Sequence, residues 1–224
     1  MTSGFVTYAV LIPLKATVRG KSRLGLADAP RAALARAMAR DTVNAVLGAA
    51  PVSSVIVVTE DEADAAVFHG VDVQIVLTSR RGLNETIAGA AGSLADQGWP
   101  GPVAVLPGDL PFLTSADLSA ALTAAAGRAG VVADADGTGT TLLVAASASE
   151  LRPQFGVGSY RRHLADGAAA LAVTPDSSLH RDVDVLSDLR ESFPGAVLGT
   201  HTQEALAGLV GFSITGSPQV RVLP

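Results

Sequence analysis

The strongest constraint on the fold of this chain is the alternation of strand-length apolar runs with longer segments of helical spacing. Apolar runs cover residues 5–12, 54–59, 71–77 and 102–106, and each is followed by a loop and a helix-length segment. Buried parallel strands are continuously apolar, and repeated strand–helix units place helices on both faces of a parallel sheet. The sequence therefore predicts a three-layer α/β fold with a mostly parallel central sheet.

Capping and turn signals place the other elements. Asp28 as N-cap and Pro30 in the first turn predict a helix to residue 47, and Thr114 or Ser115 is expected to cap a helix ending near residue 126. Further helices are predicted at 60–64, 84–96, 160–166, from 187 and at 203–210, and further strands at 130–133, 141–145, 169–173 and 181–185. Ligands bind at the carboxyl ends of parallel strands, so the loops after the strands form the expected site.

Composition narrows the class of protein. A length of 224 residues, 48% of them hydrophobic, suits a single domain, 1–224, with a substantial core. The net charge of −5 without a basic stripe argues against nucleic acid as a partner. No apolar run reaches the length of a membrane span and no signal peptide is recognisable, so we expect no membrane partner and a cytoplasmic location. The absence of cysteine excludes disulfides and thiol chemistry.

Both lysines of the chain, Lys15 and Lys21, lie in the loop after the first predicted strand, together with Arg19 and Arg23. A compact ammonium and a bidentate guanidinium are suited to hold a triphosphate. The alternative is a solvated basic loop, but the confinement of lysine to this one loop favours a ligand. The loop is not a P-loop, because only the ending Gly-Lys-Ser of that motif is present.

Three aspartates are candidates to bind a metal ion. Asp109 follows Gly108 at the end of the run 102–106, where it could hold Mg²⁺ or, alternatively, cap a turn. Asp182 and Asp184 lie two positions apart, so in a strand they would project from the same face and repel each other unless a cation lies between them. The sequence favours a metal site shared with Asp109 over an acidic edge strand.

Two glycine-containing turns carry hydroxyl groups, at Gly137–Thr140 and Phe155–Ser159. Such turns expose backbone N–H groups that bind anions, and Ser159 precedes a predicted helix whose N-terminus favours an anion. Hairpins and helix caps use the same residues, but two such turns in the half without lysines suggest a separate acceptor pocket. None of the four histidines has metal-ligand spacing, and only His163 is a candidate to face this pocket.

The order of these motifs resembles that of the guanylyltransferases of deazaflavin coenzyme (coenzyme F-420) biosynthesis. The motifs are L-x-P-L-K-x₅-K-S-R-L, L-N-x-x-I at 83–87, G-D-L-P, G-T-G-T, F-G-x-x-S and D-V-D, and they span residues 5–190. The resemblance implies the Rossmann-like NTP-transferase fold, shared with molybdenum-cofactor guanylyltransferase. It also implies attack of an acceptor phosphate on the α-phosphorus of GTP, with release of pyrophosphate. The implied acceptor is phosphoenolpyruvate or 2-phospho-L-lactate, and the alanine- and arginine-rich, lysine-poor composition favours phosphoenolpyruvate.

The resemblance also implies roles for individual residues. GTP would be bound by Pro13, Leu14, Lys15, Lys21, Arg23, Asn84 and Gly108, and the catalytic residues would be Lys21, Arg23 and Asp109. Mg²⁺ would be held by Asp109, Asp182 and Asp184, and the phosphoacid by Thr140, Gly156 and Ser159. Residues 1–112 would then form mainly the nucleotide half, 113–198 mainly the acceptor half, and 199–224 a tail of unassigned role. Asp184–Leu189 lacks the threonine of the usual D-x-D-T-P-x-D-L ending, and Ser187 is expected to replace its cap.

Two other classes of protein would share some of these features. One is an NTP transferase that makes a nucleotide sugar or a molybdopterin dinucleotide, and the other is a non-catalytic nucleotide-sensing domain. The compact hydroxyl turns favour a small phosphoacid, and the presence of all three carboxylates favours an enzyme. The expected partners are GTP and a small phosphorylated carboxylic acid. Two further hypotheses are a homo-oligomer and a transient hand-over of an unstable product to the next enzyme.

Overall fold

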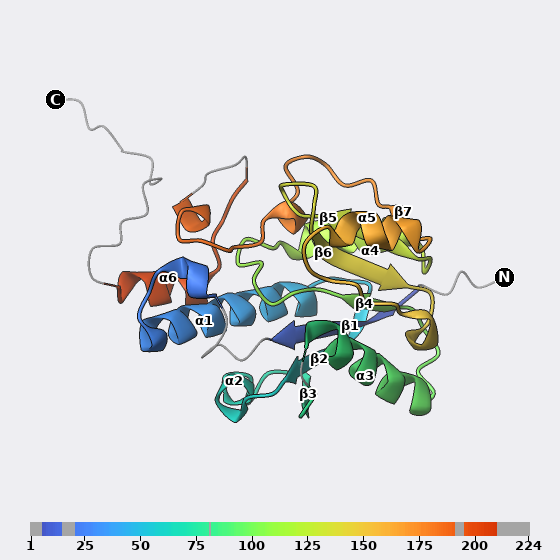
Figure 1. Cartoon of the computed structure of the whole chain (residues 1–224), viewed down its shortest axis with the longest axis horizontal. Helices are drawn as coiled ribbons and strands as arrows, with labels where there is room; N and C mark the ends of the chain where they lie inside the picture. The colour runs from blue at the N-terminus through green and yellow to red at the C-terminus, as the bar shows by residue number, and fades with distance from the viewer. Residues whose placement is uncertain (1–5, 15–20, 81, 191–194, 210–224) are drawn as a thin grey trace.

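A single seven-stranded sheet forms the centre of the computed structural model, which describes residues 6–14, 21–80, 82–190 and 195–209 (Figure 1). The strand order is β3-β2-β1-β4-β6-β5-β7, and only β6 runs antiparallel to its neighbours. The strands are β1 (Tyr8–Leu14), β2 (Val52–Thr59), β3 (Gln74–Leu77), β4 (Val103–Val105), β5 (Gly130–Ala133), β6 (Thr140–Ala145) and β7 (Ala169–Ala170). The predicted α/β fold with a mostly parallel sheet is confirmed.

The helices cover both faces of this sheet. They are α1 (Asp28–Leu47), α2 (Glu62–Ala66), α3 (Leu83–Asp96), α4 (Ser115–Ala125), α5 (Ser159–Ala165) and α6 (Thr200–Ala207), with short 3₁₀ turns η1 (Ser22–Leu24), η2 (Ala148–Glu150), η3 (Ser178–His180) and η4 (Asp188–Arg190). Alternate residues of β1 face opposite layers, because strand side chains alternate. Tyr8, Val10 and Ile12 join the core with α1 and α4, whereas Ala9 and Leu11 join the core with α3.

A third apolar cluster connects the C-terminal helix to the loops that carry the predicted site residues. Leu24 follows the basic loop, Phe112 follows the Gly-Asp-Leu-Pro loop, and Val183 lies between Asp182 and Asp184; all three are buried together with Leu206 of α6. The elements α1 and α6 lie side by side in Figure 1. Residues 199–207 of the tail are therefore part of the support beneath these loops.

The carboxylate of Asp41, on α1, anchors the start of α6. It accepts hydrogen bonds from the backbone N–H and the hydroxyl of Thr202, at 2.8 and 2.7 Å, and from the backbone N–H of His201 at 3.1 Å. These bonds use N–H groups that the first turn of a helix leaves unpaired. The Asp41 contact thus fixes α6 on α1 beneath the site loops.

Several predicted boundaries were wrong. The segment 181–185 is not a strand, and the N–H of Val183 donates a hydrogen bond to the carbonyl of Asp109 without a strand ladder. The predicted strand 169–173 contains only the two residues of β7. The N-cap of α1 is Ala27, while Asp28 lies inside the helix and pairs with Arg31. The first strand was predicted to end before Pro13, but β1 continues through it to Leu14. Proline is tolerated there because it lies past Leu11, the last residue of β1 that pairs with β4, so its missing N–H breaks no pairing on that side.

No helix in the described part of the chain has the length and apolar character needed to cross a membrane.

Candidate functional site

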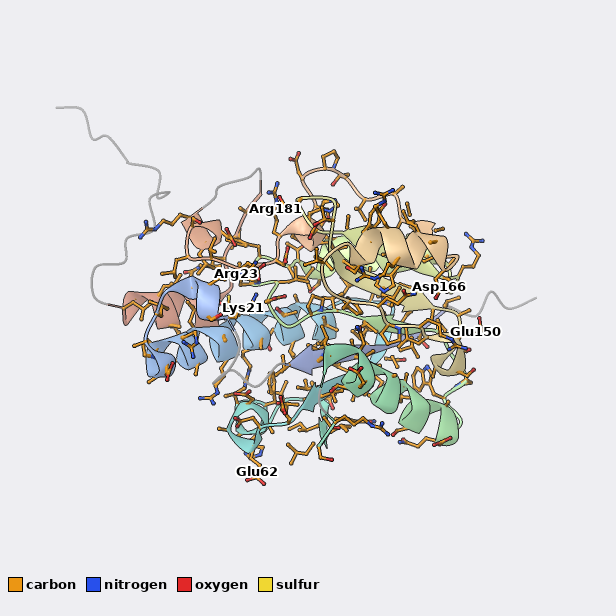
Figure 2. The ribbon with its side chains drawn as sticks, in the orientation of Figure 1. Lys21, Arg23, Glu62, Glu150, Asp166 and Arg181 are labelled. Atoms are coloured by element: carbon orange, nitrogen blue, oxygen red, sulfur yellow. The ribbon has the colours of Figure 1, made fainter. Side chains whose placement is uncertain are left out.

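The predicted site residues converge at one edge of the sheet because of strand direction. β1 and β4 are parallel, so the basic loop after β1 and the Gly-Asp-Leu-Pro loop after β4 leave the same edge. β6 runs antiparallel to β4, so its first residue, Thr140, lies at this edge as well. In Figure 2, Lys21 and Arg23 lie close together above α1, and Glu62, Glu150 and Asp166 lie away from them.

A cleft of about 590 Å³ lies at this edge. Its lining includes most of the predicted site residues, namely Pro13, Leu14, Lys21, Arg23, Gly108, Asp109, Thr140, Gly156, Ser159, Asp182 and Asp184. Asn84 does not line the cleft, and Lys15 lies outside the described residues. The structure therefore brings together two groups of residues that are far apart in the sequence, while their individual roles stay predictions.

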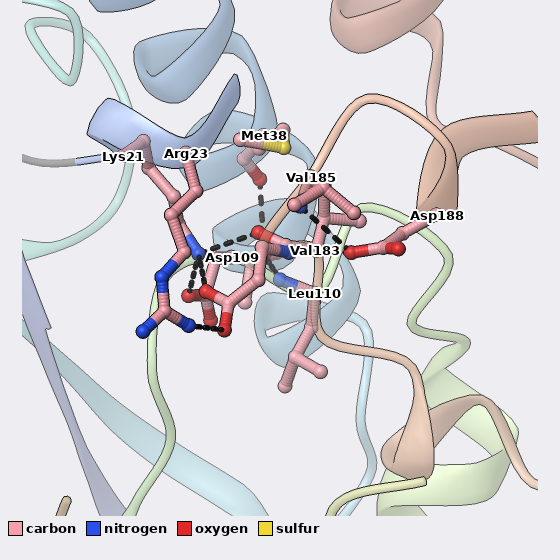
Figure 3. A network of polar contacts seen from close by, with 10 residues as sticks. Lys21, Arg23, Met38, Asp109, Leu110, Val183, Val185 and Asp188 are labelled. Atoms are coloured by element: carbon pink, nitrogen blue, oxygen red, sulfur yellow. Dashed lines mark hydrogen bonds and ion pairs between the residues drawn. The ribbon is translucent and has the colours of Figure 1, made fainter. Parts of the chain in front are cut away.

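Lys21 connects the two segments that carry the three aspartates, the Asp109 loop and the Asp182–Asp184 segment (Figure 3). Its Nζ lies 2.5 Å from Oδ2 of Asp109 and 3.0 Å from Oδ1 of Asp184, and it also donates a hydrogen bond to the backbone carbonyl of Val183. Burial alone would lower the pKa of Lys21, but the charges of Asp109 and Asp184 outweigh it and raise the pKa. The ammonium therefore stays charged, between carboxylates that would otherwise repel one another.

The backbone of Lys21 is also unusual. Its φ of 56° and ψ of 32° are in the left-handed region, which a residue with a side chain seldom adopts. Such conformations persist only where surrounding contacts impose them, and they concentrate at functional sites. The contacts of Nζ with Asp109, Asp184 and Val183 are the constraint visible here. The side chain of Arg23, two residues further on, is 76% exposed, and its Nη1 lies 3.7 Å from Oδ2 of Asp184.

The carboxylates retain features that a cation would satisfy. Oδ1 of Asp109 is buried and accepts no hydrogen bond from the described residues. Burial, followed by the charges of Asp109 and Asp184, raises the pKa of Asp182 to about 7. Unpaired buried oxygens and mutually repelling carboxylates are the donor chemistry that Mg²⁺ accepts. Among the described residues, no three acidic, His or Cys side chains are placed to hold a metal ion by themselves.

Helix α1 fixes the loop that carries Asp109. Oγ1 of Thr42 accepts the backbone N–H of Leu110 at 3.1 Å and donates to the carbonyl of Met38 at 2.9 Å (Figure 3). A Cβ at Gly108 would lie 2.3 Å from Cδ2 of Leu14, so a larger residue would require the Leu14 side chain to shift. Glycine lets the Asp109 loop pass close to the end of β1 without that shift.

Asp188 fixes the Asp-Val-Asp segment. Its Oδ2 accepts the backbone N–H groups of Asp184 and Val185, at 2.7 and 2.8 Å (Figure 3). The expectation that Ser187 supplies this cap was wrong, because the carboxylate one residue further on reaches both N–H groups at once. Val183 is buried between the two acidic residues, so Asp182 and Asp184 both line the cleft although the segment is not a strand.

The hydroxyls of Thr140 and Ser159 form a buried network with His163. Oγ of Ser159 donates to Oγ1 of Thr140 at 3.0 Å, and Oγ1 of Thr140 lies 3.0 Å from Nδ1 of His163. Ser159 is the first residue of α5. The N-cap position before it is occupied by Gly158, whose φ is 73°. The turn before it also needs glycine at 156, where φ is 120°.

The Gly137–Thr140 turn does not offer the anion-binding backbone that we expected. The carboxylate of Asp134 accepts the N–H of Thr138 at 2.8 Å and the N–H of Gly139 at 2.7 Å. The protein's own carboxylate thus uses the N–H groups that a bound anion would need. Thr140 is the residue of this turn that was predicted to bind substrate, and it lines the cleft.

The carboxamide of Asn84 joins α3 to the second hydroxyl turn. Its Oδ1 accepts the backbone N–H of Phe155 at 2.8 Å, and its Nδ2 donates to the carbonyl of Phe155 at 3.2 Å. The side chain therefore pairs with protein backbone in this structure, and Leu83 next to it lines the cleft. Contact of Asn84 with the nucleoside stays a prediction.

Sequence reasoning missed several residues that line the cleft. Ala35, Met38 and Ala39 line it from α1, and Asp134 and Asp136 line it from the loop after β5. The helix spacing of residues 35, 38 and 39 indicates a shared face, but it does not distinguish a core from a cleft. Asp134 and Asp136 follow a predicted strand, which is the signal that could have identified them.

A parallel-sheet edge that joins a basic loop, clustered carboxylates and hydroxyl-bearing turns is the arrangement of a nucleotidyltransferase. Comparison with known proteins agrees. The chain belongs to the CofC-like guanylyl transferase family, whose pattern it matches over residues 8–221.

Curated relatives cover most of the chain. It is 43% identical over 204 residues to the phosphoenolpyruvate guanylyltransferase of Thermomonospora curvata, covering 89% of this chain and 88% of the relative. It is 41% identical over 212 residues to the protein of the same name from Streptomyces scabiei, covering 91% and 97%.

Solved structures show the same fold at low sequence identity. A putative nucleotide-diphospho-sugar transferase from Desulfovibrio desulfuricans superposes with a TM-score of 0.58 at 14% identity, covering 75% of this chain and 83% of that one. A nucleotidyl transferase from Methanothermobacter thermautotroptrophicus gives 0.53 at 20% identity, covering 83% and 94%. These likenesses confirm the Rossmann-like NTP-transferase architecture.

Proposed function

We propose that this chain transfers the guanylyl group of GTP to phosphoenolpyruvate, with release of pyrophosphate, in coenzyme F-420 biosynthesis. The observation that carries the proposal is the single cleft that joins the Lys21–aspartate cluster to the Thr140–Ser159 turn. The family and the names of the curated relatives support guanylyl transfer and phosphoenolpyruvate as the acceptor. The related acceptor, 2-phospho-L-lactate, is the alternative.

The residues of the cleft supply positioning and charge, which is what this reaction requires. The acceptor phosphate is itself the nucleophile, so the protein needs neither a catalytic serine nor a cysteine. Two anionic substrates repel each other unless positive charge lies between them, and Lys21 and Arg23 provide it from one loop. Lys21 stays protonated because of its neighbouring carboxylates, so it acts as a fixed charge and not as a base.

Asp109 and Asp182 would hold a Mg²⁺ ion, with Asp184 beside them. A bound Mg²⁺ would neutralise phosphate charge and orient the phosphates for in-line displacement. The unpaired Oδ1 of Asp109 and the raised pKa of Asp182 support this assignment.

The chain divides by function at the middle of the sheet. Residues 1–112 would bind mainly the nucleotide, and residues 113–198 mainly the phosphoacid. The order of the strands supports this division, because the loop after β4 carries Asp109 and the neighbouring strand β6 begins with Thr140.

The proposal is tested by incubating the protein with Mg²⁺, each of the four NTPs and each candidate phosphoacid, and following pyrophosphate release. GTP with phosphoenolpyruvate should give the highest rate, and removal of Mg²⁺ with a chelator should stop it. Equal release with and without any phosphoacid, or release only with a sugar phosphate, would overturn the proposed acceptor.

Mg²⁺ affinity is expected to fall as the pH drops below about 7, because the raised pKa of Asp182 means that Mg²⁺ must displace a proton there. Between about pH 4 and 7 the folded metal-free protein keeps Asp182 protonated, whereas the unfolded chain loses that proton. The free energy of unfolding should therefore decrease as the pH rises over this range. Added Mg²⁺ should offset that decrease.

Calorimetric titration with Mg²⁺ at several pH values checks this. The apparent Kd should rise about tenfold per pH unit below about pH 6 and level off above about pH 8. Asp182→Asn should bind Mg²⁺ more weakly and remove most of the pH dependence. A Kd that is the same across this range in the wild-type protein would contradict the expectation.

Thr140→Val is expected to raise the KM for phosphoenolpyruvate and to leave the KM for GTP nearly unchanged. Valine keeps the shape of threonine and removes the hydroxyl, and a hydrogen bond to a charged group is worth about 1.5–3 kcal/mol, or about tenfold or more in binding. Steady-state kinetics with each substrate varied in turn measures both constants. If Thr140→Val and Ser159→Ala raise the KM for GTP and leave the KM for phosphoenolpyruvate unchanged, the assignment of these two residues to the acceptor is wrong.

A further inference from the structure

His163 lies behind the acceptor turn with both ring nitrogens hydrogen-bonded. Its Nε2 accepts the backbone N–H of Gln154 at 3.0 Å, and its Nδ1 lies 3.0 Å from Oγ1 of Thr140. The ring is buried and meets the Phe155 ring edge-on, with centroids 5.3 Å apart and an interplanar angle of 69°. His163 thus contacts the start of the turn and the hydroxyl of Thr140, a residue that lines the cleft.

These contacts determine the tautomer of the ring. A backbone N–H can only donate, so Nε2 must be without a proton, and the neutral ring then carries its proton on Nδ1. Burial, and then the nearby Arg162, lower the pKa of His163, so the ring is neutral near neutral pH. The Nδ1–H therefore donates to Oγ1 of Thr140.

The hydroxyl of Thr140 is left with one available proton. Its oxygen accepts from Nδ1–H of His163 and from Oγ–H of Ser159, which uses both of its lone pairs. The Thr140 proton has no acceptor within this network, and Thr140 lines the cleft. The network thus arranges a hydroxyl that can only donate to a group in the cleft.

We propose that His163 is a positioning residue that, in its Nδ1–H tautomer, directs the Thr140 hydroxyl proton at an anionic oxygen of the acceptor. The inference rests on the proposed function, because it assigns this part of the cleft to the phosphoacid. The same ring restrains the turn at Gln154, while Asn84 holds Phe155 and Arg162 binds the carbonyls of Gln154 and Val157. The donor and the turn are therefore oriented together.

Two substitutions separate the contacts of the ring. His163→Asn keeps an N–H group near the position of Nδ1 and loses the acceptor for Gln154, whereas His163→Gln keeps an acceptor near Nε2 and loses the donor to Thr140. His163→Gln should raise the KM for phosphoenolpyruvate about tenfold or more. His163→Asn should recover most of that loss, and the KM for GTP should stay near the wild-type value in both variants.

The exposed His69→Asn is the matched surface control. Thermal unfolding measures the folding of each variant separately. An acceptor KM that is unchanged in His163→Gln, or raised equally in both variants in step with a lower Tm, would overturn the positioning role.

A second measurement needs no turnover and no variant that folds poorly. In wild-type protein labelled with ¹⁵N-histidine, His163 should show a protonated Nδ1 and an unprotonated Nε2, and titration with phosphoenolpyruvate should shift the Nδ1 resonance. A protonated Nε2 would overturn the inference whatever the activity. If the protein releases no pyrophosphate with any phosphoacid but His163 carries its proton on Nδ1, the proposed function is wrong while the tautomer assignment stands.

Discussion

Asp109→Asn is expected to lower kcat/KM by about 100-fold or more while leaving the fold intact. Asp109 contributes an unpaired buried oxygen and the carboxylate that lies 2.5 Å from Lys21, so the substitution removes a proposed metal ligand and a counter-charge at once. Asparagine has nearly the same shape, and the loop is held independently by Thr42 and Gly108, so the Tm should change little.

The control for this variant is Asp96→Asn. Asp96 is exposed at the last residue of α3, so the substitution removes the same charge from the protein without touching the cleft. Steady-state kinetics at saturating Mg²⁺ compares the two variants. Activity of Asp109→Asn within about tenfold of wild type, about 1.4 kcal/mol in activation free energy, would contradict a metal-ligand role.

Lys21→Ala is expected to lower kcat/KM for GTP by about 30–150-fold or more. This corresponds to a loss of about 2–3 kcal/mol or more of transition-state stabilisation. An exposed salt bridge contributes only about 0–1 kcal/mol, so a larger loss distinguishes a phosphate-binding charge from a surface ion pair. The side chain of Lys21 is 15% exposed and contacts Asp109, Asp184 and Val183, which is not the environment of a solvated lysine.

Lys21→Ala should also change the metal-free protein. Without the ammonium, three carboxylates face one another, so the Tm should fall and added Mg²⁺ should restore more of it than in wild type. Arg161→Ala, which removes an exposed cation from α5, is the matched control and should show neither effect. An unchanged kcat/KM for GTP in Lys21→Ala would favour the alternative interpretation, in which the basic loop is a solvated surface loop that binds no phosphate.

Much of the site could be predicted from the sequence because local chemistry specifies it. The apolar run before Gly108 places Asp109 at the end of a strand, and the use of lysine in one loop only marks the basic loop. The alternation of strands and helices predicts the fold class, because periodicity reflects which face of each element is buried. These features depend on short stretches of chain, and although each motif is weak alone, their order along the chain is specific.

Side-chain partners could not be predicted, because they join segments far apart in the chain. Asp134 fills the turn that we expected to bind an anion, and Asp188 supplies the cap that we assigned to Ser187. The network of Ser159, Thr140 and His163 depends on α5 packing beside β6. A sequence pattern shows which groups are available, but it does not show which of them become hydrogen-bonded to each other.

The class of fold, the loops that carry the chemistry and the order of the motifs can all be predicted from the sequence, because they follow from local periodicity and residue type. The tertiary structure placed Thr140 at the same sheet edge as Asp109, since this requires β6 to pair with β4 in the antiparallel direction. It also decided that α6 supports the site, through Leu206 and the Asp41 contact. Both depend on long-range packing, whose free energy is shared among residues that no local pattern connects.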